Sequence, residues 1–176
     1  MGIRVARALN AELVELSGLV LERRLYSGYD EERSSFVVDE ARLRDELRKL
    51  ALEKGRLVVV GHYGEVVDDD VLHRIVVLRL DPRELARRLI DRGWPPEKVR
   101  ENVESELMGV CTSNALAEHP PEKVCEVDVS GRSIDDVADE VVAIILGSKP
   151  CRVYVDWLSN EAIIEYVLRL GMRSLI

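Results

Sequence analysis

Short apolar runs alternate with amphipathic helical patterns through most of this 176-residue chain. The runs RLVVVGH (56–62), RIVVLRL (74–80) and KVCEVDVS (123–130) have the character of buried strands. Strands of a parallel sheet are covered on both faces, so they read as nearly continuous apolar segments. This alternation predicts an α/β fold with a three-layer, mostly parallel sheet and right-handed crossovers.

Helix start and stop residues divide the chain further. A helix is expected from Asp39, a good N-cap, to Gly55, and another from Pro82 to Gly93. Pro95 and Pro96 then begin a long helix, whose apolar face we extend as far as Cys111. The polar run YSGYDEERSS (26–35) is interpreted as a loop.

Composition excludes several classes of function. The net charge of −8 argues against broad, direct nucleic-acid binding. The apolar runs are too short to span a bilayer, and no export signal is recognisable, so a cytoplasmic protein without a membrane partner is expected. Cys111, Cys125 and Cys151 are odd in number and lack metal-ligand spacing, so they are interpreted as buried or inert thiols.

Candidate functional residues follow the predicted strands, because ligands bind at the carboxyl ends of parallel strands. His62 could orient a water or contact a phosphate, or it could simply be satisfied in a strand-end turn. Gly28 permits close backbone approach, and Tyr26 or Tyr29 could stack on a base, unless this loop is merely solvated. The acidic run 68–70 is interpreted as a solvated turn rather than a metal site.

The most cationic part of the chain lies between residues 83 and 100. It carries five arginines around a Gly-Trp-Pro-Pro break: Arg83, Arg87, Arg88, Arg92 and Arg100. Two helices joined at such a break could form a mobile flap that brings guanidinium groups over phosphates. The same sequence is also compatible with a helical hairpin whose arginines form surface pairs with glutamates.

Four blocks in this order resemble the atypical adenylate kinases of archaea and the eukaryotic nucleus: GYDEE, VVVGHY, VVLRLDPRELARRLIDRGW and KVRENVESELMGVCTSNAL. The likeness runs from about Val5 to Arg132. It implies a P-loop nucleoside monophosphate kinase fold over residues 1–150, followed by a C-terminal extension, 151–176. The monophosphate-binding segment would be about 15–38 and the lid about 91–101.

The resemblance also implies roles for individual residues. Arg92 takes the place of the ATP-contacting arginine of the lid, and His62 that of the family's histidine after the third strand, a catalytic position. Arg132 corresponds to a basic residue beside the ATP base. Gly28, Tyr29 and Asp30 fall in the monophosphate-binding segment and are expected to bind nucleotide.

The implied reaction converts ATP and AMP to two ADP with magnesium. The implied biological role is ribosome biogenesis, including rRNA processing, with a small-subunit ribosomal protein as partner. An acidic chain suits such a basic partner, because opposite charges speed association.

The sequence departs from the family pattern at the phosphate-binding loop. In register with the helix VARAL, the P-loop lysine position falls on Gly2 and the two hydroxyl positions on Ile3 and Arg4. The first strand and the loop itself are expected to be missing, and no Gly-x-x-x-x-Gly-Lys-Ser/Thr occurs elsewhere. The acid expected two positions before His62 is Val60.

The monophosphate segment departs as well, since an Asp and an Arg expected there map onto Gly18 and Leu21, where Arg23 or Arg24 could substitute. Phosphoryl transfer depends on charge stabilisation around the phosphates, so these losses predict a very poor kinase.

Three interpretations stay open. The chain is an amino-truncated form of an active kinase or ATPase, or it is a catalytically dead pseudo-kinase that serves as a binding and assembly factor. A third and weaker interpretation is a phosphatase or hydrolase that uses His62.

Overall fold

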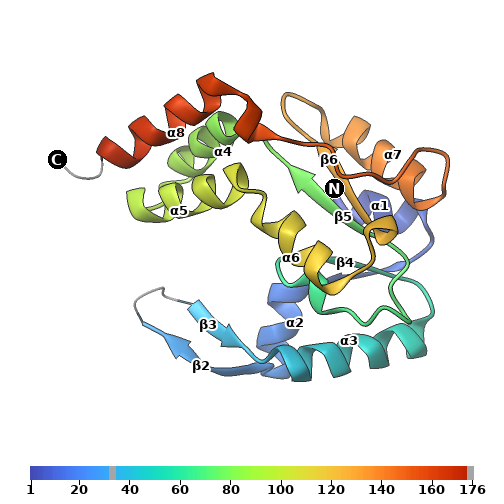
Figure 1. Cartoon of the computed structure of the whole chain (residues 1–176). Helices are drawn as coiled ribbons and strands as arrows, with labels where there is room; N and C mark the ends of the chain where they lie inside the picture. Colours follow the sequence, from blue (N-terminus) through green and yellow to red (C-terminus); the bar gives the residue numbers. More distant parts are fainter. Residues whose placement is uncertain (32–34, 174–176) are drawn as a thin grey trace. The chain divides into compact units, whose positions relative to one another are not determined.

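A computed structural model describes residues 1–31 and 35–173 of the chain (Figure 1). It contains two compact units. The first comprises Met1–Ile75 with Ala138–Lys149, and the second comprises Val76–Val137 with Pro150–Ile176. The predicted division at residue 150 stays a prediction. None of the helices in the described ranges has the length and apolar character that a bilayer crossing requires.

The first unit is built mainly from the N-terminal elements. They are α1 (Gly2–Ala8), β1 (Glu12–Glu15), α2 (Leu16–Arg23), β2 (Tyr26–Asp30), β3 (Ser35–Val38), α3 (Glu40–Lys54), β4 (Leu57–Val60) and the short 3-10 helix η1 (Gly64–Val66). Strands β1 and β4 are parallel, with Glu12 opposite Leu57 and Glu15 opposite Val60. The core beneath them is formed by Leu16, Val20, Leu25, Leu43, Leu47 and Val66.

Helix α3 confirms the predicted start and stop signals. The side chain of Asp39 accepts a hydrogen bond from the backbone N–H of Arg42 at 3.1 Å, as an N-cap does. Gly55 ends the helix with φ of 81°, a conformation that costs glycine little. Leu43 and Leu47 are the fully buried side chains of its apolar stripe.

The polar run 26–35 is not simply a loop, and that interpretation was wrong. Strands β2 and β3 form an antiparallel hairpin in which Tyr29 lies opposite Phe36 and Asp30 opposite Ser35. The ring of Phe36 also contacts Tyr26, with 4.4 Å between centroids. Cross-strand aromatic contacts stabilise a hairpin whose polar residues alone do not predict one.

The second unit contains the remaining strands and most of the later helices. They are β5 (Ile75–Arg79), α4 (Pro82–Asp91), α5 (Pro96–Leu107), α6 (Val110–Glu118), η2 (Pro121–Lys123), β6 (Val124–Asp128), η3 (Trp157–Ser159) and α8 (Glu161–Arg173). Helix α7 (Ile134–Ile145) begins in this unit and continues into the first. Strands β5 and β6 pair with each other.

The C-terminal helix α8 lies along α4 and α5 (Figure 1). Ile163 and Val167 of α8 are buried against both helices. Their partners are Ala86 and Leu89 of α4 and Val99 and Val103 of α5. The three helices therefore share one apolar core.

The α/β class with parallel strands is confirmed, and its strands pair two by two: β1 with β4, β2 with β3, and β5 with β6. The long helix expected from Pro96 to Cys111 is instead two helices. Gly109 interrupts it with φ of 65°, and Cys111 is exposed on α6. A Cβ at Gly109 would lie 3.4 Å from the guanidinium of Arg79, so the chain turns where that buried group sits.

The interpretation of all three cysteines as inert thiols was also wrong. Cys125 of β6 and Cys151 form a disulfide across a sequence separation of 26 residues. Sequence spacing did not reveal the pair, because it depends on the segment after α7 returning alongside β6.

Candidate functional site

The loops at the carboxyl ends of β5 and β6 are hydrogen-bonded to each other. The backbone N–H of Asp81, after β5, donates to the hydroxyl of Ser130, after β6, at 2.8 Å. That hydroxyl donates in turn to the carboxylate of Asp128 at 2.6 Å. The N–H of Gly131 donates to Glu84 in the first turn of α4 at 3.1 Å. These bonds fix the strand ends, the place where α/β folds bind ligands.

Arg132 belongs to this fixed loop. Its guanidinium donates to the carbonyl oxygens of Asp128 at 3.0 Å and Asp136 at 3.3 Å. It therefore links the end of β6 to the first turn of α7. These hydrogen bonds stabilise the loop and fix the guanidinium of Arg132. A nucleotide base bound beside it would contact a side chain that is already ordered.

Arg92 has quite different surroundings. It is the C-cap residue of α4, directly before Gly93, whose φ of 73° ends the helix. Its side chain is exposed, and its guanidinium makes neither a hydrogen bond nor an ion pair with residues 1–31 or 35–173. Trp94, the next large side chain, is 42% exposed.

Most of the neighbouring arginines are paired with acids. Arg83 binds Asp81 at 2.6 Å, Arg88 binds Glu84 at 2.6 Å, and Arg100 lies 3.8 Å from Glu104. Such surface pairs were predicted by the interpretation of residues 83–100 as a helical hairpin whose arginines pair with glutamates. Within the described residues neither Arg87 of α4 nor Arg92 has such a pair, and of these two Arg92 lies at the tip between α4 and α5.

The structure does not bring Arg92 and Arg132 together. The loop that holds Arg132 is tied to the first turn of α4, and Arg92 caps the last turn of the same helix. A helix of 10 residues is about 15 Å long. The two arginines therefore lie toward opposite ends of α4.

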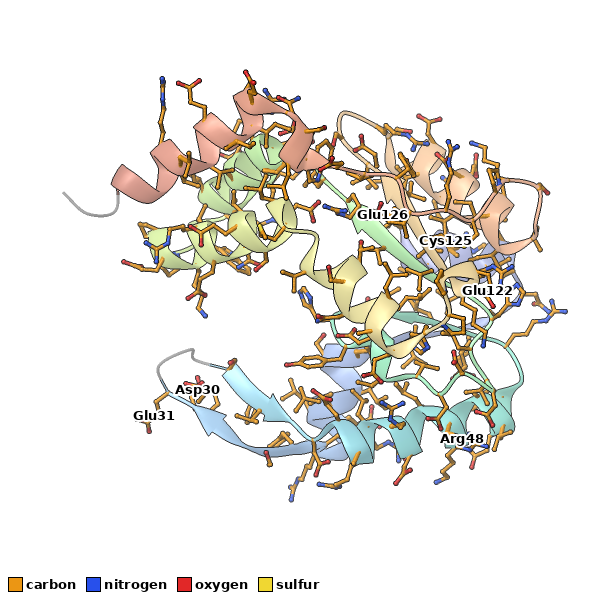
Figure 2. The ribbon with its side chains drawn as sticks, in the orientation of Figure 1. Asp30, Glu31, Arg48, Glu122, Cys125 and Glu126 are labelled. Carbon is orange, nitrogen blue, oxygen red and sulfur yellow. A yellow bond between two sulfur atoms is a disulfide. The ribbon has the colours of Figure 1, made fainter. Side chains whose placement is uncertain are left out.

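A buried charge network underlies these loops. Arg79, at the end of β5, is 3% exposed and pairs with Glu126 of β6 and with Glu106 of α5, the latter at 2.8 Å. Glu126 also accepts from Thr112 at 2.6 Å and from the N–H groups of Tyr154 and Val155 at 2.8 and 2.7 Å. Figure 2 labels Glu126 beside Cys125 on β6.

The network keeps both partners charged. Burial alone would raise the pKa of Glu126, but hydrogen bonds from Thr112, Val155, Tyr154 and Arg79 outweigh it and lower that pKa. Burial likewise lowers the pKa of Arg79, and the attraction of Glu106 and Glu126 more than reverses this, so the net direction is upward. Both carboxylates and the guanidinium are engaged in internal hydrogen bonds, so we assign the network a role in positioning the strand ends.

Sequence reasoning missed this network. Its signal was nevertheless present: Arg79 and Glu126 each interrupt an otherwise apolar strand. A charge inside a buried strand needs an opposite charge, and two such strands in one sheet are natural partners.

In the first unit, His62 is exposed in a tight turn after β4. Gly61 before it has φ of 137° and Tyr63 after it has φ of 66°. A Cβ at Gly61 would lie 3.0 Å from the Cβ of Leu16, so only glycine lets the turn approach α2 this closely. His62 is therefore exposed directly after a half-buried strand.

Gly28, Tyr29 and Asp30 lie together on β2, on which Figure 2 labels Asp30. The ring of Tyr29 is 53% exposed and meets Phe36 edge-on, with 5.2 Å between centroids. Open space surrounds the position of a Cβ at Gly28, so the fold itself does not require glycine there. The hairpin offers an accessible backbone beside an exposed aromatic ring. Glu32, Arg33 and Ser34, also in the predicted monophosphate segment, lie outside the described residues.

The end of β4 is apolar where the resemblance expects an acid. A Cβ at Gly2 would lie 3.0 Å from Cγ1 of Val60 and 3.2 Å from Cδ1 of Leu13. In the acidic run, Asp68 and Asp70 pair with Arg48 of α3, each within 3.0 Å, and Asp68 also pairs with Arg44. Figure 2 labels Arg48 on α3. Among the described residues, no three His, Cys, Asp or Glu side chains are grouped as metal ligands.

Comparison with known proteins identifies the family. The family described as "AAA domain" matches residues 4–109. A protein of Saccharolobus solfataricus named "Putative adenylate kinase" is 34% identical over 167 residues, covering 95% of this chain and 84% of that protein. A protein of the same name from Methanocaldococcus jannaschii is 28% identical and covers 90% and 84%, respectively. One from Halobacterium salinarum is 37% identical and covers 78% of each. The chain belongs to the adenylate kinase-like family of P-loop proteins.

Proposed function

We propose that this chain acts on adenosine nucleotides as a nucleoside monophosphate kinase, with ATP and AMP as substrates and two ADP as products. The observation that carries the proposal is Arg92. It is exposed at the α4–α5 tip without a partner among the described residues, as is Arg87 on α4, while Arg83, Arg88 and Arg100 are paired with acids; Arg92 differs from Arg87 in lying at the junction of the two helices. An unpaired arginine at a helix junction suits a lid that neutralises phosphates.

The other residues have distinct roles in this proposal. Gly28, Tyr29 and Asp30 on the β2–β3 hairpin receive the monophosphate nucleotide, with Tyr29 offering its exposed ring. His62 contacts a phosphate or orients water at the end of β4. Arg132, fixed by two carbonyl oxygens, borders the ATP base.

Magnesium fits the described residues poorly. Such ions are usually held by one or two carboxylates together with substrate phosphates. The carboxylate expected at the end of β4 is Val60, whose surroundings include Leu13, and the printed sequence contains no P-loop motif.

This poor fit favours a second candidate function, a catalytically dead binding module. In it the chain keeps the nucleotide-kinase fold and acts as an assembly factor for the small ribosomal subunit in the cytoplasm. Its partner would be a basic small-subunit ribosomal protein, for which the net charge of −8 is suited. Val60 supports this candidate, because it departs from the catalytic pattern inside the described fold.

Calorimetric titration of the chain with ATP and magnesium tests both candidates, together with an assay of ADP formation from ATP and AMP. The kinase proposal expects micromolar binding that Arg92→Ala weakens about tenfold or more. Arg88→Ala is the matched control, since Arg88 is on the same helix but paired with Glu84.

Binding without ADP formation would favour the binding module. Absence of nucleotide binding in the unsubstituted chain would defeat the kinase proposal. Equal effects of Arg92→Ala and Arg88→Ala would remove the role given to Arg92.

A further inference from the structure

The segment Pro150–Asn160, here called the strap, runs from the end of the α7 region to α8 and is attached along β6. The disulfide joins Cys151 to Cys125. The next β6 residue, Glu126, donates its N–H to the carbonyl oxygen of Arg152 at 2.9 Å. Two residues further, the N–H of Asp128 donates to the hydroxyl of Tyr154 at 3.1 Å.

The side chain of Glu126 holds the middle of the strap. Its Oε2 accepts from the N–H groups of both Tyr154 and Val155, while its Oε1 accepts from Thr112 and Arg79. This carboxylate is fully buried. The strap is therefore attached by one covalent bond and by several hydrogen bonds that do not depend on it.

The strap leads directly to the α4–α5 helix pair. Trp157 donates its indole N–H to Glu106 of α5 at 2.8 Å and packs beside the shared helix core. Helix α8 follows and buries Ile163 and Val167 against α4 and α5. The contacts that hold the strap therefore also restrain α8, the helix that packs on α4 and α5.

The two sulfurs are unequally accessible. Cys125 is fully buried in β6, while Cys151 is partly exposed at the start of the strap. An attacking thiolate therefore reaches the sulfur of Cys151 first. The reactivity of a disulfide depends on such access to one of its sulfurs.

We propose that the Cys125–Cys151 disulfide is a reversible redox site whose reduction frees the Cys151 end of the strap, leaves its hydrogen bonds to Glu126 and Glu106 in place, and thereby loosens the strap and, through α8, the α4–α5 helix pair. The reductant is a dithiol. Its first thiolate attacks the sulfur of Cys151, the S–S bond breaks, and Cys125 leaves as a thiolate that takes up a proton. The second thiol of the reductant then attacks the mixed disulfide and releases Cys151. The protein gains two electrons and two protons, and the dithiol becomes a disulfide.

The attachments that remain after reduction distinguish a switch from a simple staple. Glu126 still accepts from Tyr154 and Val155, and α8 still has its apolar face, so the chain stays folded while the strap moves more freely. The identification of 91–101 as a lid rests on the proposed function, whereas the coupling of the strap to the helices rests on the contacts alone.

Hydrogen–deuterium exchange of the full chain, without nucleotide, tests the coupling with and without dithiothreitol. Reduction should speed exchange of the strap, α8 and the α4–α5 pair by about tenfold or more, and leave α3 of the first unit unchanged. The thermal midpoint should fall by about 6–12 °C, with the chain still folded at 25 °C.

Two variants accompany this measurement. Cys151→Ser keeps the buried Cys125 and should reproduce the reduced state, with no further response to dithiothreitol. Cys111→Ser is the matched control, because Cys111 is exposed on α6 outside the disulfide, and it should respond as the unsubstituted chain does.

Three results would overturn the proposal. Alkylation and mass spectrometry could find Cys125 and Cys151 as free thiols in the air-oxidised chain. Exchange in α4 and α5 could be the same in both redox states. Reduction could unfold the whole chain, which would make the bond a staple only. Because nucleotide is absent, none of these results depends on whether the kinase proposal is correct.

Discussion

The two units carry ion-pair clusters of opposite character. In the second unit, Arg79 and Glu126 are almost completely buried. In the first, Arg48 meets Asp68 and Asp70 with side chains that are 42%, 27% and 57% exposed, respectively. Both clusters join a helix or strand to a distant segment. Water can replace the exposed contacts of Arg48, but it cannot reach the buried contacts between Arg79 and Glu126. Burial, rather than the number of ion pairs, decides how strongly each cluster constrains the chain.

The two clusters therefore have different structural roles. The Arg79 cluster ties together β5, β6, α5 and the strap, and it thereby sets the loops that carry Asp81 and Ser130. The Arg48 cluster only holds the acidic turn against α3.

The largest effect is expected from Arg79→Ala, which leaves the carboxylates of Glu106 and Glu126 without their buried cation. Removing one member of a buried ion pair costs about 3–5 kcal/mol of unfolding free energy. Urea denaturation measures the loss. A cost below about 1 kcal/mol would show that water reaches the site and that the buried cluster is no stronger than a surface one.

Glu126→Gln should cost about 2–3 kcal/mol at pH 7, because an amide cannot accept from all of its present donors. It should also change the pH dependence. The pKa of Glu126 in the folded chain is below its ordinary 4.5, so its stabilisation is complete above pH 4.5 and is lost as pH falls below that value.

Urea denaturation between pH 7 and pH 3 compares Glu126→Gln with the unsubstituted chain. The gap in unfolding free energy should narrow as the pH falls below 4.5. Asp81, whose pKa is also lowered, is present in both chains and cancels in the difference. A gap that stays constant down to pH 3 would contradict the assignment of an ionised Glu126.

Much of the fold could be predicted from the sequence, because its elements have local causes. Asp39 and Gly55 bound α3, and Pro82 and Gly93 bound the α4 region, through backbone preferences that act within a few residues. The apolar runs predicted β4, β5 and β6, because the pattern of apolar residues within each run is also a local signal.

The errors have separate causes. Gly109, with φ of 65°, is a local break between α5 and α6 of the same kind as Gly55, and the prediction of one long helix passed over it. The Tyr29–Phe36 contact is also local, but a polar run gives no apolar alternation from which to predict a hairpin. The disulfide alone among these three depends on distant segments, since it requires the strap to return to β6. The site residues Arg92, Arg132 and His62 were selected by family resemblance, and their roles stay predictions.

A moderate effect is expected from Gly109→Ala. The residue has φ of 65°, and the added methyl would lie 3.4 Å from the Arg79 guanidinium. A left-handed alanine costs about 1–2 kcal/mol, and displacement of Arg79 would add to that. Gly147→Ala, with φ of 78° and open space around its Cβ, is the control for the backbone cost alone. Equal losses of unfolding free energy in the two variants would show that Arg79 can be displaced without a measurable cost.

The smallest effect is expected from Asp70→Asn. Its carboxylate is 57% exposed, and the hydrogen bond from Arg48, which chiefly lowers the pKa of Asp70, competes with water. The urea midpoint should be indistinguishable from that of the unsubstituted chain at physiological salt, because Arg48 keeps Asp68 as a partner. A loss as large as that of Glu126→Gln would contradict the contrast between the units, since it would mean that an exposed pair constrains the fold as firmly as a buried one.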